Sequence, residues 1–152
     1  MYIFKLITRL LIHNVERPKI HRSPILKYYS EPQIIFIPAR QITGILDADK
    51  QFFWQHHGQG MEDYISLAQR STILYKKWLL GTPIDKLSLD PECTEIAKAY
   101  LTEHEMVQVI RKNANEYEWA NDGRHRTAAA QRLDIHILVR VIGEYEPEQT
   151  ES

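Results

Sequence analysis

The chain has 152 residues, a formal net charge of −1, 43% hydrophobic residues and 26% charged residues. This size and composition are typical of one globular domain with a hydrophobic core, and they argue against a protein that is basic overall and binds nucleic acid through its net charge. The single cysteine, Cys93, excludes a disulfide framework within the chain and suits a reducing compartment, so we expect a cytoplasmic protein.

The first segment, residues 1–16, is predicted to form an amphipathic helix. Lys5 and Arg9 interrupt its apolar run, so we expect no membrane span. We expect the helix to dock on the core, with a membrane-surface anchor or a partner-binding helix, such as one that forms a homodimer, as alternatives. Residues 17–32 contain three prolines and predict an irregular connection, so that residues 1–32 form an N-terminal extension.

The middle of the chain alternates short strands and helices. We predict a strand at residues 33–37, a loop or short helix at 47–60, and an amphipathic helix at 61–80 that ends at Gly81 and Pro83. The stretch "TPIDKLSL" suggests a further short extended piece. Asp90 and Pro91 are typical of a helix start, and this helix would run to Tyr100.

The C-terminal third gives the clearest pattern. Alternating β-rich residues predict strands at 106–111, 117–120 and 135–142, with a turn at "NANE" and a helix at 123–133. Residues 146–152 form an acidic tail that we expect to fray. The sum is an α+β domain over residues 33–145, with a helical insertion at 61–80.

The turn "DGRHR", residues 122–126, is the strongest candidate for a functional site. A helix leaves its first N–H groups without partners, and its dipole makes that end mildly positive, so an anion binds there readily. Gly123 lets a ligand approach the backbone. Arg124, His125 and Arg126 oppose the dipole unless an anion is bound, and Asp122 as cap and ion-pair partner of Arg126 is the alternative interpretation. The alanines that follow, residues 128–130, predict close packing of this helix on a sheet.

The segment of about residues 104–143 resembles the ParB/sulfiredoxin-like superfamily. Its members show two strands, a turn of the type Gly-x-His-Arg, an alanine-rich helix and a closing strand. Asp122, Gly123, His125 and Arg126 match stand-alone members with a D-G-x-H-R turn. The resemblance implies a small mixed sheet with packed helices, and nucleotide phosphate binding at the turn.

Two departures limit what carries over from the family. Arg124 occupies the place of the cysteine that sulfiredoxin-like enzymes need, so sulfinic acid reduction is not expected. The sequence ends within about ten residues of the last strand, so we do not expect the helix-turn-helix of partition proteins. Whether the protein catalyses a reaction stays open. If it does, it could be a nucleotide hydrolase, a phosphotransferase or a ParB-like nuclease.

The nucleotide hypothesis gives each residue of the turn a role. Phosphate oxygens would be bound by residues 123–127, that is by Gly123, Arg124, His125, Arg126 and Thr127. Asp122 and His125 are the catalytic candidates: Asp122 would reach a Mg²⁺ ion that a nucleoside triphosphate brings, and His125 would bond a phosphate or transfer a proton. We expect no resident metal site, because the adjacent His56 and His57 lack metal-ligand spacing.

Two other functions stay open. The same basic turn could bind or nick DNA, and the chain could be a non-catalytic protein-interaction module that uses its N-terminal helix. The aromatic residues Phe52, Phe53 and Trp54 are expected in the core, with stacking on a base as the alternative. The identity of the base and of any acceptor is not encoded in a recognisable pattern.

Overall fold

The structure is a computed structural model that describes residues 24–87 and 91–146, and one mixed sheet organises this part of the chain. Its strands are β1 (Leu26–Pro38), β2 (Ile42–Thr43), β3 (Val107–Asn113), β4 (Glu116–Asn121) and β5 (His136–Tyr145), in the order β1-β5-β3-β4-β2. β5 pairs antiparallel with β1 and parallel with β3, while β4 pairs antiparallel with β3 and parallel with β2. The predicted α+β class and mixed sheet are confirmed.

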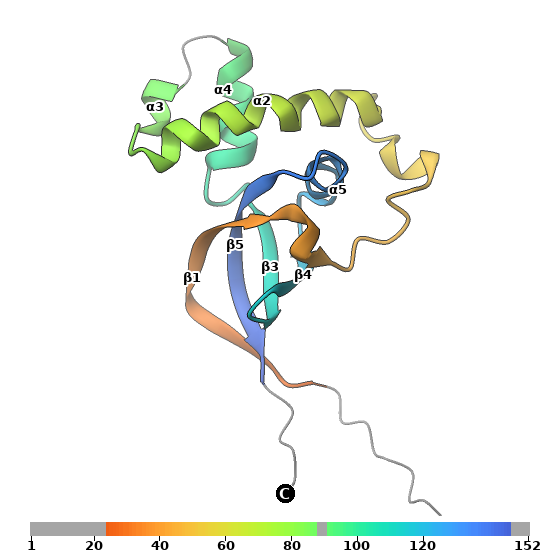
Figure 1. Cartoon of the computed structure of the whole chain (residues 1–152), viewed down its shortest axis with the longest axis vertical. Coiled ribbons are helices and arrows are strands. Elements are labelled where there is room, and N and C mark those ends of the chain that lie inside the picture. The colour runs from red at the N-terminus through yellow and green to blue at the C-terminus, as the bar shows by residue number, and fades with distance from the viewer. Residues whose placement is uncertain (1–23, 88–90, 147–152) are drawn as a thin grey trace, which may run out of the picture.

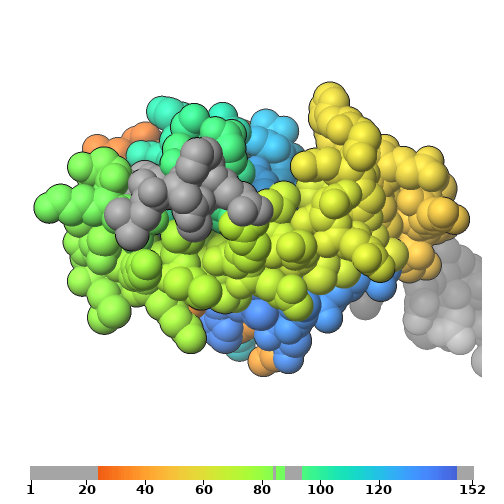
Figure 2. Space-filling view, turned by 90° about the horizontal axis from the view of Figure 1, so that it is seen from above, coloured from red at the N-terminus to blue at the C-terminus, as the bar shows by residue number. Residues whose placement is uncertain are grey.

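Helices cover one end of this sheet (Figure 1). They are α2 (Met61–Leu79), α3 (Ile84–Leu87), α4 (Pro91–Leu101) and α5 (Arg124–Arg132), with short 3-10 turns η1 (Ala39–Gln41) and η2 (Gln51–Trp54). α2 packs against α5 and α4, and α5 lies between α2 and the sheet (Figure 1). Seen from above, α2 runs across the molecule with α3 at one end (Figure 2). The predicted helices at 61–80, 91–100 and 123–133 are thus confirmed within a few residues.

The core forms where the central strands meet α5. Val107 and Val109 of β3 pair with Val139 and Val141 of β5, and residues that pair in register point to the same face of a sheet. All four are at most 4% exposed. Ala130 of α5 joins this cluster, and because its side chain is a single methyl, the helix backbone approaches the strands closely.

The other two alanines of α5 serve its opposite side. Ala128 and Ala129 pack with Phe53, Trp54, Tyr64 and Ala68 in a second apolar cluster, which joins η2 and α2 to α5. Phe53 and Trp54 are therefore core residues, as expected, while Phe52 is 61% exposed. The predicted packing of the alanine run on the sheet is confirmed for Ala130, whereas Ala128 and Ala129 pack against η2 and α2, a contact that was not predicted.

The first strand begins earlier than predicted. Residues 26–32 were expected in an irregular connection, but Leu26 and Tyr28 already pair with Tyr145 and Gly143 of β5. Pro32 does not end the strand, because the register shifts between Tyr28 and Gln33 and so accommodates it. Local proline content was misleading here, since pairing with a long partner strand decided the conformation.

The stretch after α2 was also predicted wrongly. Residues 84–87 of "TPIDKLSL" form the helical turn α3 and not an extended piece, and the N–H of Lys86 donates to the carbonyl of Pro83 at 3.0 Å. Pro83 fits the start of such a turn. Leu87 is buried in the main core, so tertiary packing rewards the helical form. Sequence patterns also missed β2, whose two residues, Ile42 and Thr43, are too few to give a periodic signal.

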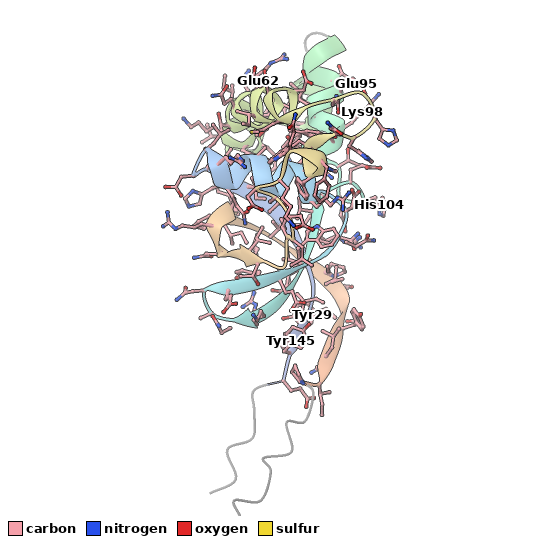
Figure 3. The ribbon with its side chains drawn as sticks, turned by 90° about the vertical axis from the view of Figure 1, so that its right-hand side faces the viewer. Tyr29, Glu62, Glu95, Lys98, His104 and Tyr145 are labelled. Atoms are coloured by element: carbon pink, nitrogen blue, oxygen red, sulfur yellow. The ribbon has the colours of Figure 1, made fainter. Side chains whose placement is uncertain are left out.

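Two tyrosines link strands at the end of the sheet remote from the helices (Figure 3). The hydroxyl of Tyr29 in β1 donates to Glu144 in β5 at 2.9 Å. The hydroxyl of Tyr145 in β5 donates to Glu118 in β4 at 3.1 Å. These bonds join β1, β5 and β4 at the end where no helix covers them.

Several expectations concern residues that lie outside the described ranges. These are the helix at 1–16, Asp90 as a cap and the tail from residue 147 onward. Within residues 24–87 and 91–146, no helix has the length and apolar character needed to cross a membrane.

We expect Gly143→Ala to destabilise the fold by about 1–3 kcal/mol, because an overpacked methyl group forces the backbone to shift. A Cβ atom at this position would lie 2.5 Å from the Lys27 carbonyl oxygen and 3.1 Å from the Tyr28 Cα of the neighbouring strand. Urea denaturation measures the change. Gly60→Ala is the control and should cost less, since its Cβ would meet nothing closer than Asp63 Oδ2 at 3.9 Å. Equal stability of G143A and wild type would contradict the close approach of β1 and β5.

Candidate functional site

The turn between β4 and α5 has a backbone that few sequences adopt. Asp122 and Gly123 are consecutive left-handed residues, with φ values of 55° and 70°. Asp122 Oδ1 accepts the N–H of Gly123 at 2.6 Å, and the Asp122 carbonyl accepts the indole N–H of Trp119 at 2.7 Å. A Cβ atom on Gly123 would lie 2.6 Å from Val107 Cγ2. Glycine is therefore required here by both the backbone angle and the space.

Gly123 is the N-cap of α5, and no described side chain caps this end. The first bonds of the helix run from the N–H and the hydroxyl of Thr127 to the Gly123 carbonyl, both at 2.9 Å. The N–H groups of residues 124–126 precede this first intrahelical bond. They therefore form the open, mildly positive end of the helix that the sequence predicted.

Arg126 is held by the main chain. Its guanidinium donates from Nη1 to the Ala99 carbonyl, in the last turn of α4, and from Nη2 to the Glu105 carbonyl at 2.6 Å. The side chain is 13% exposed, and Asp122 Oδ1 is 3.6 Å from Nη2. A cation at the C-terminal end of a helix interacts favourably with the dipole. The positive charge of Arg126 is unfavourable at the N-terminal end of α5 but favourable at the C-terminal end of α4. An arginine at this position is therefore explained without a bound ligand.

Arg124 is the exposed cation of the turn. Its guanidinium lies over the ring of Phe53, 5.4 Å from the centroid, in a cation–π contact. No carboxylate within the described residues forms an ion pair with it. A bound anion at the helix end would therefore find the Arg124 charge available.

His125 lies in a stack of aromatic rings and is only 8% exposed. The ring is stacked with Tyr64 of α2, with centroids 4.9 Å apart, and with His56, at 4.8 Å. Nε2 is 2.8 Å from the Phe53 carbonyl, which only accepts hydrogen bonds, so Nε2 carries the hydrogen. Burial lowers the pKa of His125; the hydrogen bond to the Phe53 carbonyl opposes this shift, and the nearby Arg124 and His56 add to it. A neutral ring with Nε2–H engaged leaves Nδ1 as an acceptor.

A cavity of about 770 Å³ opens in front of this turn. Four successive residues of the turn, 122–125, and Arg126 line it on one side. The other walls come from the loop before α2, from α2, α4, the connection between α4 and β3, and β4, and include His56, Tyr64, Glu95, Tyr100, Glu105 and Trp119. α4 carries Glu95 and Lys98, and His104 lies in the connection below it (Figure 3). The volume is in the range of small-molecule sites in proteins.

The structure brings most of the predicted site residues together. Asp122, Gly123, Arg124, His125 and Arg126 all line the cavity. Thr127 does not: it is fully buried, and its hydroxyl is bonded back to the Gly123 carbonyl. Binding of phosphate by these residues stays a prediction.

Sequence reasoning missed the walls supplied by other elements. Tyr64, Tyr100 and Trp119 are far from one another in the chain. Each of them also falls at a position that suits a hydrophobic core. The sequence offered only a slight signal of a binding site: each of these residues is aromatic, carries a polar atom and lies next to an apolar stripe. Nothing in the spacing indicated that α4 would meet the start of α5.

A metal or cofactor has few ligands here. Within residues 24–87 and 91–146, no three or more His, Cys, Asp or Glu side chains come together as a metal site. The Asp122 carboxylate is about half exposed, and one of its oxygens already accepts a hydrogen bond. Asp122 alone could reach a cation that arrives with its own ligands.

Comparison of the chain with protein-family models, curated proteins and solved structures gave no match. The resemblance to the ParB/sulfiredoxin-like superfamily therefore stays a prediction from the motif around residues 122–126.

We expect Arg126→Ala to lower stability by about 2 kcal/mol, because charged hydrogen bonds to two carbonyls are lost and the part-buried bond to Ala99 is among them. This corresponds to a decrease in Tm of roughly 4–8 °C. Thermal unfolding monitored by circular dichroism measures it. Arg124→Ala is the control, since its exposed side chain should change stability by less than about 0.5 kcal/mol. A Tm for R126A within a degree of wild type would contradict the structural role of this guanidinium.

Stability should fall on acidification in a way that depends on His125. The pKa of His125 is lowered in the folded chain, so the unfolded chain binds the proton more readily. The stability that this group contributes is present above its ordinary pKa of about 6.5 and is lost as the pH falls through the lower, folded value. Urea denaturation between pH 7.5 and 5 measures the slope. His125→Gln, which keeps a donor but does not titrate, should reduce the slope; an unchanged slope would assign it to other groups.

Proposed function

We propose that this protein binds a nucleoside triphosphate, with the phosphates at the N-terminal end of α5. The observation that carries the proposal is the geometry of the turn: two left-handed residues, Asp122 and Gly123, expose the first N–H groups of α5 to a cavity of about 770 Å³. Helix N-termini of this kind bind phosphate groups through N–H donors and the dipole. The motif resemblance to nucleotide-binding proteins supports the same ligand class.

In this proposal, the residues around the cavity have the following roles. Arg124 is exposed and would form charge-assisted hydrogen bonds with a phosphate. Arg126 would contribute its positive charge from the wall while it holds α4. Asp122 would contact the Mg²⁺ that accompanies the triphosphate. His125 is neutral with Nε2–H engaged, so it would accept a hydrogen bond from the ligand instead of donating one to a phosphate.

The proposal covers binding, and hydrolysis or phosphoryl transfer would need a further group. Glu105 and Glu95 line the other walls of the cavity and are the candidate carboxylates for such a role besides Asp122. The same carboxylates weigh against the DNA alternative, because they repel a continuous phosphate backbone that passes the cavity. A compact triphosphate that ends at the turn avoids this repulsion.

A thermal-shift assay tests the proposal. At a concentration 100 times its dissociation constant, a ligand stabilises the folded state by about 2.7 kcal/mol. This should raise Tm by roughly 5–10 °C. We expect this result with at least one of ATP, GTP, CTP and UTP in the presence of Mg²⁺.

Arg124→Ala should weaken the binding by about tenfold or more, because one charge-assisted bond is lost. Arg40→Ala is the matched control: it removes the same charge from an exposed arginine that pairs with Asp134. Wild-type protein that shows no shift with any of the four nucleotides would refute the proposed function.

A further inference from the structure

Tyr100 has a buried hydroxyl group without a partner. The residue lies in the last turn of α4, lines the cavity and is 4% exposed. Its hydroxyl oxygen finds no hydrogen-bond partner among the described residues. Buried polar groups are almost always hydrogen-bonded, and an exception calls for a physical reason.

A neighbouring tyrosine shows that this feature is specific to Tyr100. Tyr75 of α2 is 2% exposed, and its ring lies 6.2 Å from that of Tyr100. Ser71 and the main chain of Leu138 lie close enough to the Tyr75 hydroxyl to lower its pKa, and this hydroxyl is not among the buried polar atoms that lack a partner. Two tyrosines in the same apolar layer thus differ: the one away from the cavity is satisfied, and the one that lines it is not.

The surroundings of Tyr100 favour an anion as the missing partner. The Arg126 guanidinium lies 5.5 Å from the centre of its ring. Burial raises the pKa of Tyr100 to about 12, although the Arg126 charge opposes the shift, so the hydroxyl keeps its proton at neutral pH. A protonated hydroxyl beside a fixed positive charge is a donor placed to meet a negative acceptor.

We propose that Tyr100 recognises the ligand by donating its hydroxyl hydrogen bond to a phosphate oxygen of the bound triphosphate. The inference rests on the proposed function and extends it to a second wall of the cavity. Phosphate contacts would then come from α5 and α4 together. The hydroxyl is covered in the ligand-free chain, so a small movement of a neighbouring side chain accompanies the contact.

Tyr100→Phe is the decisive variant, because it removes only the hydroxyl. A hydroxyl without a protein partner contributes nothing to the ligand-free fold, so the Tm of Y100F without ligand should equal or exceed that of wild type. Its affinity for the nucleoside triphosphate that shifts wild type most should be about tenfold weaker, measured by isothermal titration calorimetry with Mg²⁺. Tyr75→Phe is the matched control: it should lower Tm by a few degrees and leave the affinity unchanged.

The outcomes separate this inference from the proposed function. If Y100F binds the nucleotide as tightly as wild type, the inference is overturned and the proposed function stands. If Y100F without ligand loses as much stability as Y75F, the hydroxyl has a structural partner and the inference is again overturned. If wild type binds none of the four nucleotides, both fall together.

Discussion

The guanidinium of Arg126 is the interaction on which the rest of the site depends. It joins the last turn of α4 and the connection before β3 to the first turn of α5, through carbonyls that belong to segments 20 residues or more away. Two helix ends of opposite polarity meet there, and one buried cation satisfies the C-terminal end of α4. The Arg126 guanidinium fixes the distance between these two helix ends, and the cavity lies between them.

The site combines a short local motif with walls that come from distant parts of the chain. Residues 122–126 supply the N–H groups, the glycine and the exposed cation, all within one turn. The loop before α2, α2 itself and α4 supply the aromatic rings that surround His125 and the cavity. Because those rings cover both faces of the imidazole, only its edges remain for chemistry. In the proposed site, the local motif would therefore set which charge is bound, while the distant walls would set which shape fits.

The sequence predicted the parts of this molecule that depend on local physics. Alternation gave β3, β4 and β5, and the glycine and alanines around α5 gave a tight turn and a closely packed helix. Predictions failed where distant contacts decided the outcome. Pairing with β5 extended β1 past Pro32, and burial of Leu87 favoured a helical turn at α3. The same limit applied to the site: the carbonyl partners of Arg126, which belong to Ala99 in α4 and Glu105 in the connection before β3, have no sequence signal.

The interruption in β1 has a consequence for how the molecule behaves at high concentration. β1 forms one border of the sheet, and among the described strands it has a neighbour on one side only. A long uninterrupted border would offer a template on which another polypeptide could add and begin an aggregate. Pro32 lacks an N–H group, and the irregular pairing between Tyr28 and Gln33 breaks the repeat in the middle. Pro32 made this strand hard to predict from the sequence, and the same residue limits the addition of further strands at the border of the sheet.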